Sequence, residues 1–269
     1  MGSGVVGNYY QTRIQIAGVT VVGTTDASGF PASNVLDWGH PLVRWQSDNL
    51  TGDKVLVFDL SATPPNYVGF YIGRVNFTSA FLQANATDSW GSPTHNVAIS
   101  FTNDSYVSRL QGTFFYLADR STINLRFARL RIPSGTGVND GATGYKVGLM
   151  VPMVSAVEID NRAPVRRVVT KGKLFNALGG GAEDLVAISQ RRMQLELPWT
   201  WLWDPSLSPV TNEEANMLAL AADPETPVVV VPNLNRLYES YLCRQAGEIQ
   251  IETEVGIGAT MPLLLREIS

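Results

Sequence analysis

The sequence predicts a mainly β protein in two parts, a jelly-roll β-sandwich at the N-terminal end and a smaller C-terminal α+β unit with one short helix. Three observations lead to this prediction. Short β-like runs recur along the first 160 residues, separated by clusters of Gly, Pro, Asn and Asp. The composition then turns basic and glycine-rich, and only one helix-like pattern follows. With 45% hydrophobic and 16% charged residues, the chain has the composition of an ordered protein with a core.

Eight runs in the first part have the composition of strands. They span residues 13–22, 54–60, 67–74, 81–86, 96–101, 113–117, 123–132 and 145–159. Strands at this spacing are typical of a sandwich or jelly roll. The run "INLRFARLRI" places three arginines between apolar residues, and Ala128 breaks its step. The apolar residues of this run that we expect to be buried are Ile123, Leu125, Phe127, Leu130 and Ile132.

The segment "DNRAPVRRVVTKGK" is basic and precedes the glycine-rich "ALGGGAEDL", so the composition of the chain changes here. We predict a sandwich at residues 1–160, a basic and Gly-rich connecting arm at 161–189 and a separate C-terminal α+β domain at 190–269. The basic residues Arg162, Arg166 and Arg167 fit either a solvated strand face or an arm that docks on an acidic neighbour.

The C-terminal part begins with "RRMQLELPWTWLWD", which places Trp199, Trp201 and Trp203 at a period of two on a strand. Three aromatic residues on one strand face favour a core or an oligomer interface, although stacked indoles could also hold sugar rings. The one helix is expected at 211–222, where Thr211 and Glu214 form a capping box.

Composition excludes several classes of function. The net charge of −4 does not give the excess of positive charge that nucleic-acid binding needs. The single cysteine, Cys243, rules out an internal disulfide, and its alternating surroundings favour a small buried strand residue over a reactive thiol. The N-terminus has no signal-peptide pattern, and no stretch approaches the roughly 18 apolar residues of a membrane span. We therefore expect a protein made in a cytoplasm, without membrane insertion.

Catalytic motifs are not found in the sequence. It contains no G-x-S-x-G, H-E-x-x-H, Walker A or strand-following G-x-G-x-x-G pattern, and only two histidines are available for a triad or a metal. The acidic turns "SDNLTGD" and "NDGATG" lack EF-hand spacing, so turn chemistry explains them better than calcium. We predict no enzyme, no metal and no cofactor.

Two short stretches hold the candidate ligand-binding residues. In "PASNVLDWGHPLVRWQSD", we expect Asn34 and Asp37 to shape a turn and Trp45 to fill the core, which leaves Trp38 and His40 for a ligand. In "DSWGSPTHN", Trp90 and His95 lie in an expected loop between strands. Such a loop suits ligand contact, and a tryptophan packed on its own domain is equally common.

The first part resembles a discoidin-like, galactose-binding-type β-sandwich. The residues that match the pattern of such domains are Ala32, Asn34, Asp37, Trp45, Ser47, Asp59, Leu60, Ile72, Gly73 and Asn76. They appear in the order that the family has them, from "ASNVLDWGHPLVRWQSDN" through "KVLVFDLSA" to "YIGRVN". The resemblance covers about residues 15–160 and implies the sandwich fold.

The C-terminal part resembles the closing segment of tail proteins from long-tailed phages, on "RRMQLELPWTWLWD", the short helix, "PVVVVPNLNRLYESYLCR" and "LLLREI". This resemblance implies a minor or distal tail component that joins the tail tube to tip proteins as a symmetric homo-oligomeric ring. The implied partners are the tail tube, the tape measure and the tip hub, and the implied location is the virion tail tip. The six Arg and Trp residues of the C-terminal half named above are then interface candidates.

The alternative function is a carbohydrate-binding module or tail adhesin that holds host-surface glycans. It would use the sandwich loops around Trp38–His40 and Trp90–His95. A glycan hydrolase is the third and weakest interpretation, since a carboxylate pair can be drawn from 24 acidic residues but no motif selects one.

Overall fold

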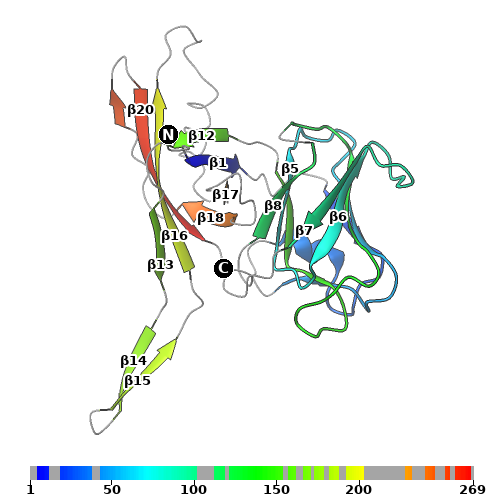
Figure 1. Ribbon diagram of the computed structural model, residues 1–269, viewed down its shortest axis with the longest axis horizontal. Helices are drawn as coiled ribbons and strands as arrows, with labels where there is room; N and C mark the ends of the chain where they lie inside the picture. The colour runs from blue at the N-terminus through cyan, green and yellow to red at the C-terminus, as the bar shows by residue number, and fades with distance from the viewer. Residues whose placement is uncertain are drawn as a thin grey trace. The chain divides into compact units, whose positions relative to one another are not determined.

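The computed structural model describes residues 5–11, 19–37, 43–101, 112–118, 121–153, 157–161, 166–170, 173–178, 182–187, 192–202, 228–231, 240–245, 252–254 and 258–267 (Figure 1). The chain divides into two compact units. The sandwich unit comprises Gly7–Glu158 and Thr226–Leu242, and the second unit comprises Met1–Val6, Ile159–Glu225 and Cys243–Ser269. The domain boundaries expected at residues 160 and 190 stay predictions.

The larger sheet of the sandwich unit has five antiparallel strands in the order β2-β4-β9-β6-β7. Their bounds are Thr20–Gly23 for β2, Lys54–Asp59 for β4, Phe127–Ile132 for β9, Ser79–Asn85 for β6 and His95–Ser100 for β7. Figure 1 shows β6 beside β7. These strands fall in or next to five of the predicted runs, which confirms the period-two reading of this part of the sequence.

The smaller sheet is antiparallel, with the order β11-β5-β8. Its strands are β11 (Leu149–Met153), β5 (Gly69–Gly73) and β8 (Gly112–Tyr116), and a two-stranded ladder pairs β10 (Lys146–Val147) with β3 (Trp45–Gln46). The 3-10 helix η1 (Ala32–Leu36) precedes β3. The single run expected at 145–159 is broken into β10, β11 and the start of β12 (Val157–Asn161).

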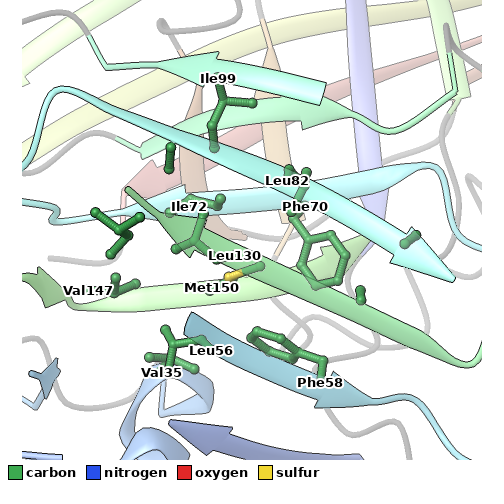
Figure 2. Packing of buried hydrophobic residues seen from close by; sticks show 14 of the residues in the cluster. Val35, Leu56, Phe58, Phe70, Ile72, Leu82, Ile99, Leu130, Val147 and Met150 are labelled. Carbon is green, nitrogen blue, oxygen red and sulfur yellow. The ribbon is translucent and has the colours of Figure 1, made fainter. Parts of the chain in front are cut away.

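The main core lies between these two sheets. Figure 2 shows Leu56, Phe58, Leu82 and Leu130 of the larger sheet together with Phe70, Ile72 and Met150 of the smaller one. The rings of Phe58 and Phe70 meet edge to face with their centroids 5.4 Å apart. Burial of each such ring contributes roughly 1.5–3 kcal/mol. The predicted mainly β fold with a sandwich is confirmed.

Trp45, which precedes β4, forms part of this core, as the sequence predicts. Trp45 is 0% exposed, and its indole N–H donates to Asp26 Oδ1 at 2.7 Å. The Asn34 amide donates to the carbonyl of Arg44 at 2.9 Å, and the Asp37 N–H donates to the Asn34 carbonyl at 3.1 Å. The expectation that Trp45 is scaffold and that Asn34 shapes the turn is therefore confirmed.

Strand β9 corrects one detail of the sequence prediction. Ala128, Leu130 and Ile132 are buried in the core, whereas Phe127 alternates with them and lies on the same side as Arg129 and Arg131. Phe127 was expected in the core because it is apolar. The backbone alternation instead assigns the inward position to the small Ala128.

The smaller sheet is buried on both faces. Tyr71, Phe114 and Val151 pair across β5, β8 and β11, point away from the main core and are at most 3% exposed. The segment 226–242 belongs to the same compact unit, and the N–H of Phe114 donates to Ser240 Oγ at 3.3 Å. A sheet covered on both sides explains why "YVGFYIG" is continuously apolar.

Two more strands complete this description of the sandwich unit. Strand β1 (Val5–Gln11) pairs antiparallel with β17 (Val228–Val231) through Asn8–Gln11. Strand β18 (Tyr241–Gln245) begins in this unit, and its Cys243 is buried, as the alternation predicts.

In the second unit, the longest described strands are β16 (Arg192–Leu202) and β20 (Gly258–Glu267), paired antiparallel along nine positions from Gln194–Arg266 to Leu202–Gly258. Strand β13 (Arg166–Thr170) pairs with β16, and β19 (Glu252–Glu254) pairs with β20. Strands β14 (Lys173–Leu178) and β15 (Ala182–Ala187) pair with each other in the segment expected as an arm. The helix expected at 211–222 lies outside the described residues.

Among the described residues, no helical segment reaches the length and hydropathy that a membrane-spanning helix needs.

Candidate functional site

The outer face of the five-stranded sheet carries a row of arginines, each stacked on an aromatic ring. The guanidinium carbon of Arg126 lies 4.8 Å from the ring centroid of Phe127, that of Arg129 lies 4.4 Å from Trp90, and that of Arg131 lies 5.4 Å from Phe81. Strand alternation places Phe81, Phe127, Arg129 and Arg131 on this face, opposite the core residues of β6 and β9. Cation–π contacts of this kind contribute about 0.5–1 kcal/mol each at exposed sites.

Trp90 lies in the loop that joins β6 to β7, and two contacts fix its half-buried ring. Its indole N–H donates to Asp88 Oδ1 at 2.6 Å, and the Arg129 guanidinium lies against the ring. The same loop is tied to the end of β6 because the Asn85 amide donates to the carbonyl of Ser89 at 2.6 Å and Thr94 Oγ1 donates to Asn85 Oδ1 at 2.9 Å. The loop is therefore pinned at its base and at its tryptophan.

Arg129 is oriented from below by two amide side chains. Its Nε donates to Gln83 Oε1 at 2.5 Å, and Gln83 Nε2 donates to Asn96 Oδ1 at 2.9 Å. Since arginine can only donate, the Gln83 oxygen must face it, and the Gln83 amide nitrogen must then meet an oxygen of Asn96. Gln83 is only 3% exposed. We call Trp90, Arg129, Gln83 and Asn96 the Trp90 cluster.

The other two arginines are neutralised by aspartates. Arg126 pairs with Asp59 through two hydrogen bonds of 2.8 and 2.7 Å, and Arg131 Nε lies 2.7 Å from Asp53 Oδ2. The hydrogen bond from Arg126 lowers the pKa of Asp59, and the Ser134 N–H together with Arg131 lowers the pKa of Asp53.

Arg129 differs from both neighbours in its charge balance. It is not within ion-pair distance of any carboxylate in the described part of the chain. Burial lowers the pKa of its guanidinium and the charge of Arg131 lowers it further, while Asp88 and Asp53 act in the opposite direction. An arginine stays protonated in proteins all the same. The Trp90 cluster thus holds one positive charge without a paired carboxylate.

The structure separates Trp90 from His95, which the sequence analysis had grouped. His95 opens β7 opposite Ala84, and alternation puts it on the core side with Val97 and Ile99. Trp90 contacts Arg129 on the outer side. The two therefore do not form one site. Trp38 and His40, the other two candidates, lie outside the described residues.

The interface candidates are located only in part. Arg166 and Arg167 lie in β13. In the antiparallel register they stand opposite Glu196 and Leu195 of β16. Trp199 and Trp201 lie in β16 and pair with Met261 and Ala259 of β20. Arg162 and Trp203 lie outside the described residues.

The acidic turns serve the fold, as their turn composition predicts. Asp140 of "NDGATG" accepts from Asn76, from the Ala142 N–H and from Lys146 Nζ at 2.9, 3.1 and 2.6 Å. In the earlier turn, Asp48 Oδ1 accepts from Lys54 Nζ at 2.8 Å. Within the described ranges, no three His, Cys, Asp or Glu side chains come together in a way that could hold a metal ion.

The sequence analysis missed Arg129, Gln83 and Asn96. Arg129 was noted only as one of three arginines between apolar residues, and nothing in the sequence shows that it meets a tryptophan and a buried glutamine. The available signal was the presence of three arginines between the apolar residues of "INLRFARLRI".

No protein-family model and no curated protein sequence matches this chain. Among solved structures, the chain is similar to chitosan-binding module 1 derived from a chitosanase/glucanase of Paenibacillus sp. IK-5, at 17% identity and a TM-score of 0.35 over 49% of this chain and 92% of that one. Chitosan-binding module 2 from the same enzyme, in complex with chitotriose, matches at 16% identity and a TM-score of 0.35 over 50% and 95%. A CBM32-3 from a family 31 glycoside hydrolase of Clostridium perfringens matches at 14% and 0.38 over 51% and 91%.

Proposed function

We propose that this chain is a carbohydrate-binding protein and that the Trp90 cluster holds the sugar. The supporting observation is a tryptophan ring fixed on the outer face of a rigid sheet, next to donors whose directions are already set. This was the alternative in the sequence analysis, but the site is now different, because it consists of Trp90 with strand residues instead of Trp90 with His95.

The arrangement suits a sugar for physical reasons. The C–H face of a pyranose packs on an indole ring, and hydroxyl groups around the ring edge accept from guanidinium and amide donors. Because Arg129 and Trp90 are already held by Gln83 and Asp88, little side-chain entropy is lost when a ligand binds. A fixed aromatic ring beside fixed donors is what a shallow sugar site requires.

Trp90→Ala tests the proposal. We expect the intact chain to be retained by at least one glycan on an array and the variant to lose at least tenfold in affinity. The variant loses one cation–π contact and one exposed hydrogen bond to Asp88, which together contribute about 1–2.5 kcal/mol, so the melting temperature should fall by only a few degrees.

The matched control is Val22→Ala, which removes an apolar side chain that is 65% exposed on β2, at the opposite edge of the same sheet. It should leave binding unchanged. If the intact chain binds no glycan, or if both variants lose binding equally, the Trp90 cluster is not a sugar site.

We also propose the assembly role that the resemblance to phage tail proteins implies, with the chain located at the virion tail tip as a homo-oligomer. One observation favours it: among the strands that the structure describes, β14 and β15 pair only with each other, so their outer edges offer hydrogen-bonding groups to another chain. Light scattering across a hundredfold range of concentration tests this role. A particle that stays monomeric throughout contradicts a self-assembled ring.

Both proposals describe a protein that binds and does not turn over its ligand. The expectation that the chain is not an enzyme is tested by incubation of each retained glycan with the protein, followed by mass analysis. Any shortened product would overturn it.

A further inference from the structure

The Trp90 cluster has a feature that a site for neutral sugars does not need, namely a guanidinium without a paired carboxylate. We infer that the ligand is an acidic glycan and that its sugar carboxylate pairs with Arg129 while the sugar ring packs beside Trp90. This inference rests on the proposed function and names the class of sugar.

The two terminal nitrogens of Arg129 are the donors that remain for a ligand. Its Nε is used by Gln83, and its terminal nitrogens make no hydrogen bond with a described residue. The edge formed by two guanidinium nitrogens matches the two oxygens of a carboxylate, and such bidentate pairs are among the strongest polar contacts in proteins.

Arg126 and Arg131 allow a direct comparison with Arg129. Arg126 and Arg131 have the same residue type and the same kind of aromatic contact, and each has an aspartate partner at 2.7 Å. Arg129 lies between them in sequence and has none. A pattern in which two of three arginines are neutralised leaves the third as the place where an anion gains most.

Asp88, in the same loop as Trp90, is the carboxylate that could compete with a ligand for Arg129. The charge of Asp88 opposes the lowering of the Arg129 pKa by burial, but the Asp88 Oδ1 accepts from the Trp90 indole N–H at 2.6 Å. It therefore serves to hold the ring and does not form an ion pair with Arg129. A ligand carboxylate does not have to displace it.

The buried amide of Gln83 holds the Arg129 side chain in place. Gln83 is 3% exposed although it lies on the outer face of the sheet, because the residues of this face cover it. A buried amide that accepts from Nε and donates to Asn96 fixes the plane of the guanidinium. The orientation of the free edge is thus set before a ligand arrives, which favours recognition of a planar group.

The test uses oligogalacturonate, oligoglucuronate and sialyllactose, each compared with its own methyl ester, in titration calorimetry with the full chain. The ester keeps every ring atom, removes the charge and adds one methyl group, so Arg129→Gln separates the loss of charge from the added bulk. We expect at least one acid to bind, its ester to bind more than about tenfold more weakly, and Arg129→Gln to abolish this preference.

Arg126→Gln is the matched control, since it changes net charge by the same amount but removes a guanidinium already bonded to Asp59. It should keep the preference for the acid. Arg129→Lys keeps the charge without the planar edge, and it should lie between the intact chain and Arg129→Gln; it also serves if Arg129→Gln does not fold.

The outcomes separate the two proposals. Equal binding of acid and ester, lost in Trp90→Ala, overturns the acidic ligand and leaves the carbohydrate-binding function in place. A preference for the acid that survives Arg129→Gln overturns the role of Arg129. Absence of binding to every acid, every ester and every neutral glycan of the array overturns both.

Discussion

Asn76 makes three hydrogen bonds to one loop with a single side chain. Its amide nitrogen donates to Asp140 Oδ1 at 2.9 Å and to the Gly144 carbonyl at 3.0 Å, and its oxygen accepts from the Lys146 N–H at 2.7 Å. The residue is 6% exposed. One amide thus anchors the loop 139–146 to the turn between β5 and β6. The same burial explains why Asn76 has no room for a glycan despite its N-x-T sequon.

Asn76→Ala should be one of the most destabilising polar substitutions in the sandwich unit. It leaves the Gly144 carbonyl and the Lys146 N–H without their partner, and each unsatisfied buried group costs about 1–3 kcal/mol. We expect the free energy of unfolding to fall by roughly 2–4 kcal/mol in urea titrations. Asn96→Ala, at an exposed amide whose Oδ1 accepts from Gln83 Nε2, should cost less than about 1 kcal/mol. Equal losses in both variants would contradict this account.

At the scale of elements, β4 and β9 are held together at both ends by ion pairs. Asp59 ends β4 and pairs with Arg126, next to the first residue of β9. Asp53 precedes β4 and pairs with Arg131, and it also accepts from the Ser134 N–H at 3.0 Å. Between these ends the ladder runs from Lys54–Ile132 to Asp59–Phe127. The ion pairs therefore favour this register of the two adjacent strands.

These two carboxylates predict how stability depends on pH. The pKa of Asp59 is lowered by the hydrogen bond from Arg126, and that of Asp53 is lowered by Ser134 and Arg131, from the ordinary value of 3.8. A carboxyl whose pKa is lowered in the folded state stabilises the fold above its unfolded pKa, and the gain is lost as pH falls through the folded pKa. The loss should therefore be concentrated below pH 3.8.

The double variant Asp53→Asn/Asp59→Asn isolates this effect. Its free energy of unfolding should lie below that of the intact chain from pH 7 to pH 5, and the two curves should converge as pH falls below 3.8. Chemical denaturation at a series of pH values measures both curves. A gap that stays constant down to pH 2.5 would show that the aspartates act through packing and not through charge.

Some of these features could be predicted from the sequence, and others could not. Trp45, Asn34 and the β4 strand were predictable because turn chemistry and period-two alternation are local. Phe127 was misplaced because apolarity and alternation disagree there, and the backbone alternation prevailed. The Trp90 cluster could not be predicted, since Arg129 and Gln83 are 46 residues apart and meet only through the register of β6 and β9. No local pattern encodes that register.

At the scale of the whole molecule, the sandwich unit is discontinuous in sequence. The smaller sheet has a second buried face, with Tyr71, Phe114 and Val151. The compact unit that contains this sheet joins Gly7–Glu158 with Thr226–Leu242. Four residues of that segment, Val229, Val230, Tyr241 and Leu242, are themselves at most 4% exposed. Their apolar character is visible in the sequence, but no local pattern shows that they belong to the same compact unit as the sandwich.

A fragment of residues 1–160, the domain that the sequence predicts, should therefore be an incomplete folding unit. Without Thr226–Leu242 it would expose apolar side chains on the outer side of β5 and β8, and exposed patches of this kind cause association. We expect the fragment to bind the dye ANS and to unfold at lower urea concentration than the full chain. Residues 1–158 joined by a flexible Gly/Ser linker to 226–242 should recover both properties. If the 1–160 fragment unfolds cooperatively and binds no dye, the second buried face does not depend on the later segment, and the boundary at residue 160 is a true domain boundary.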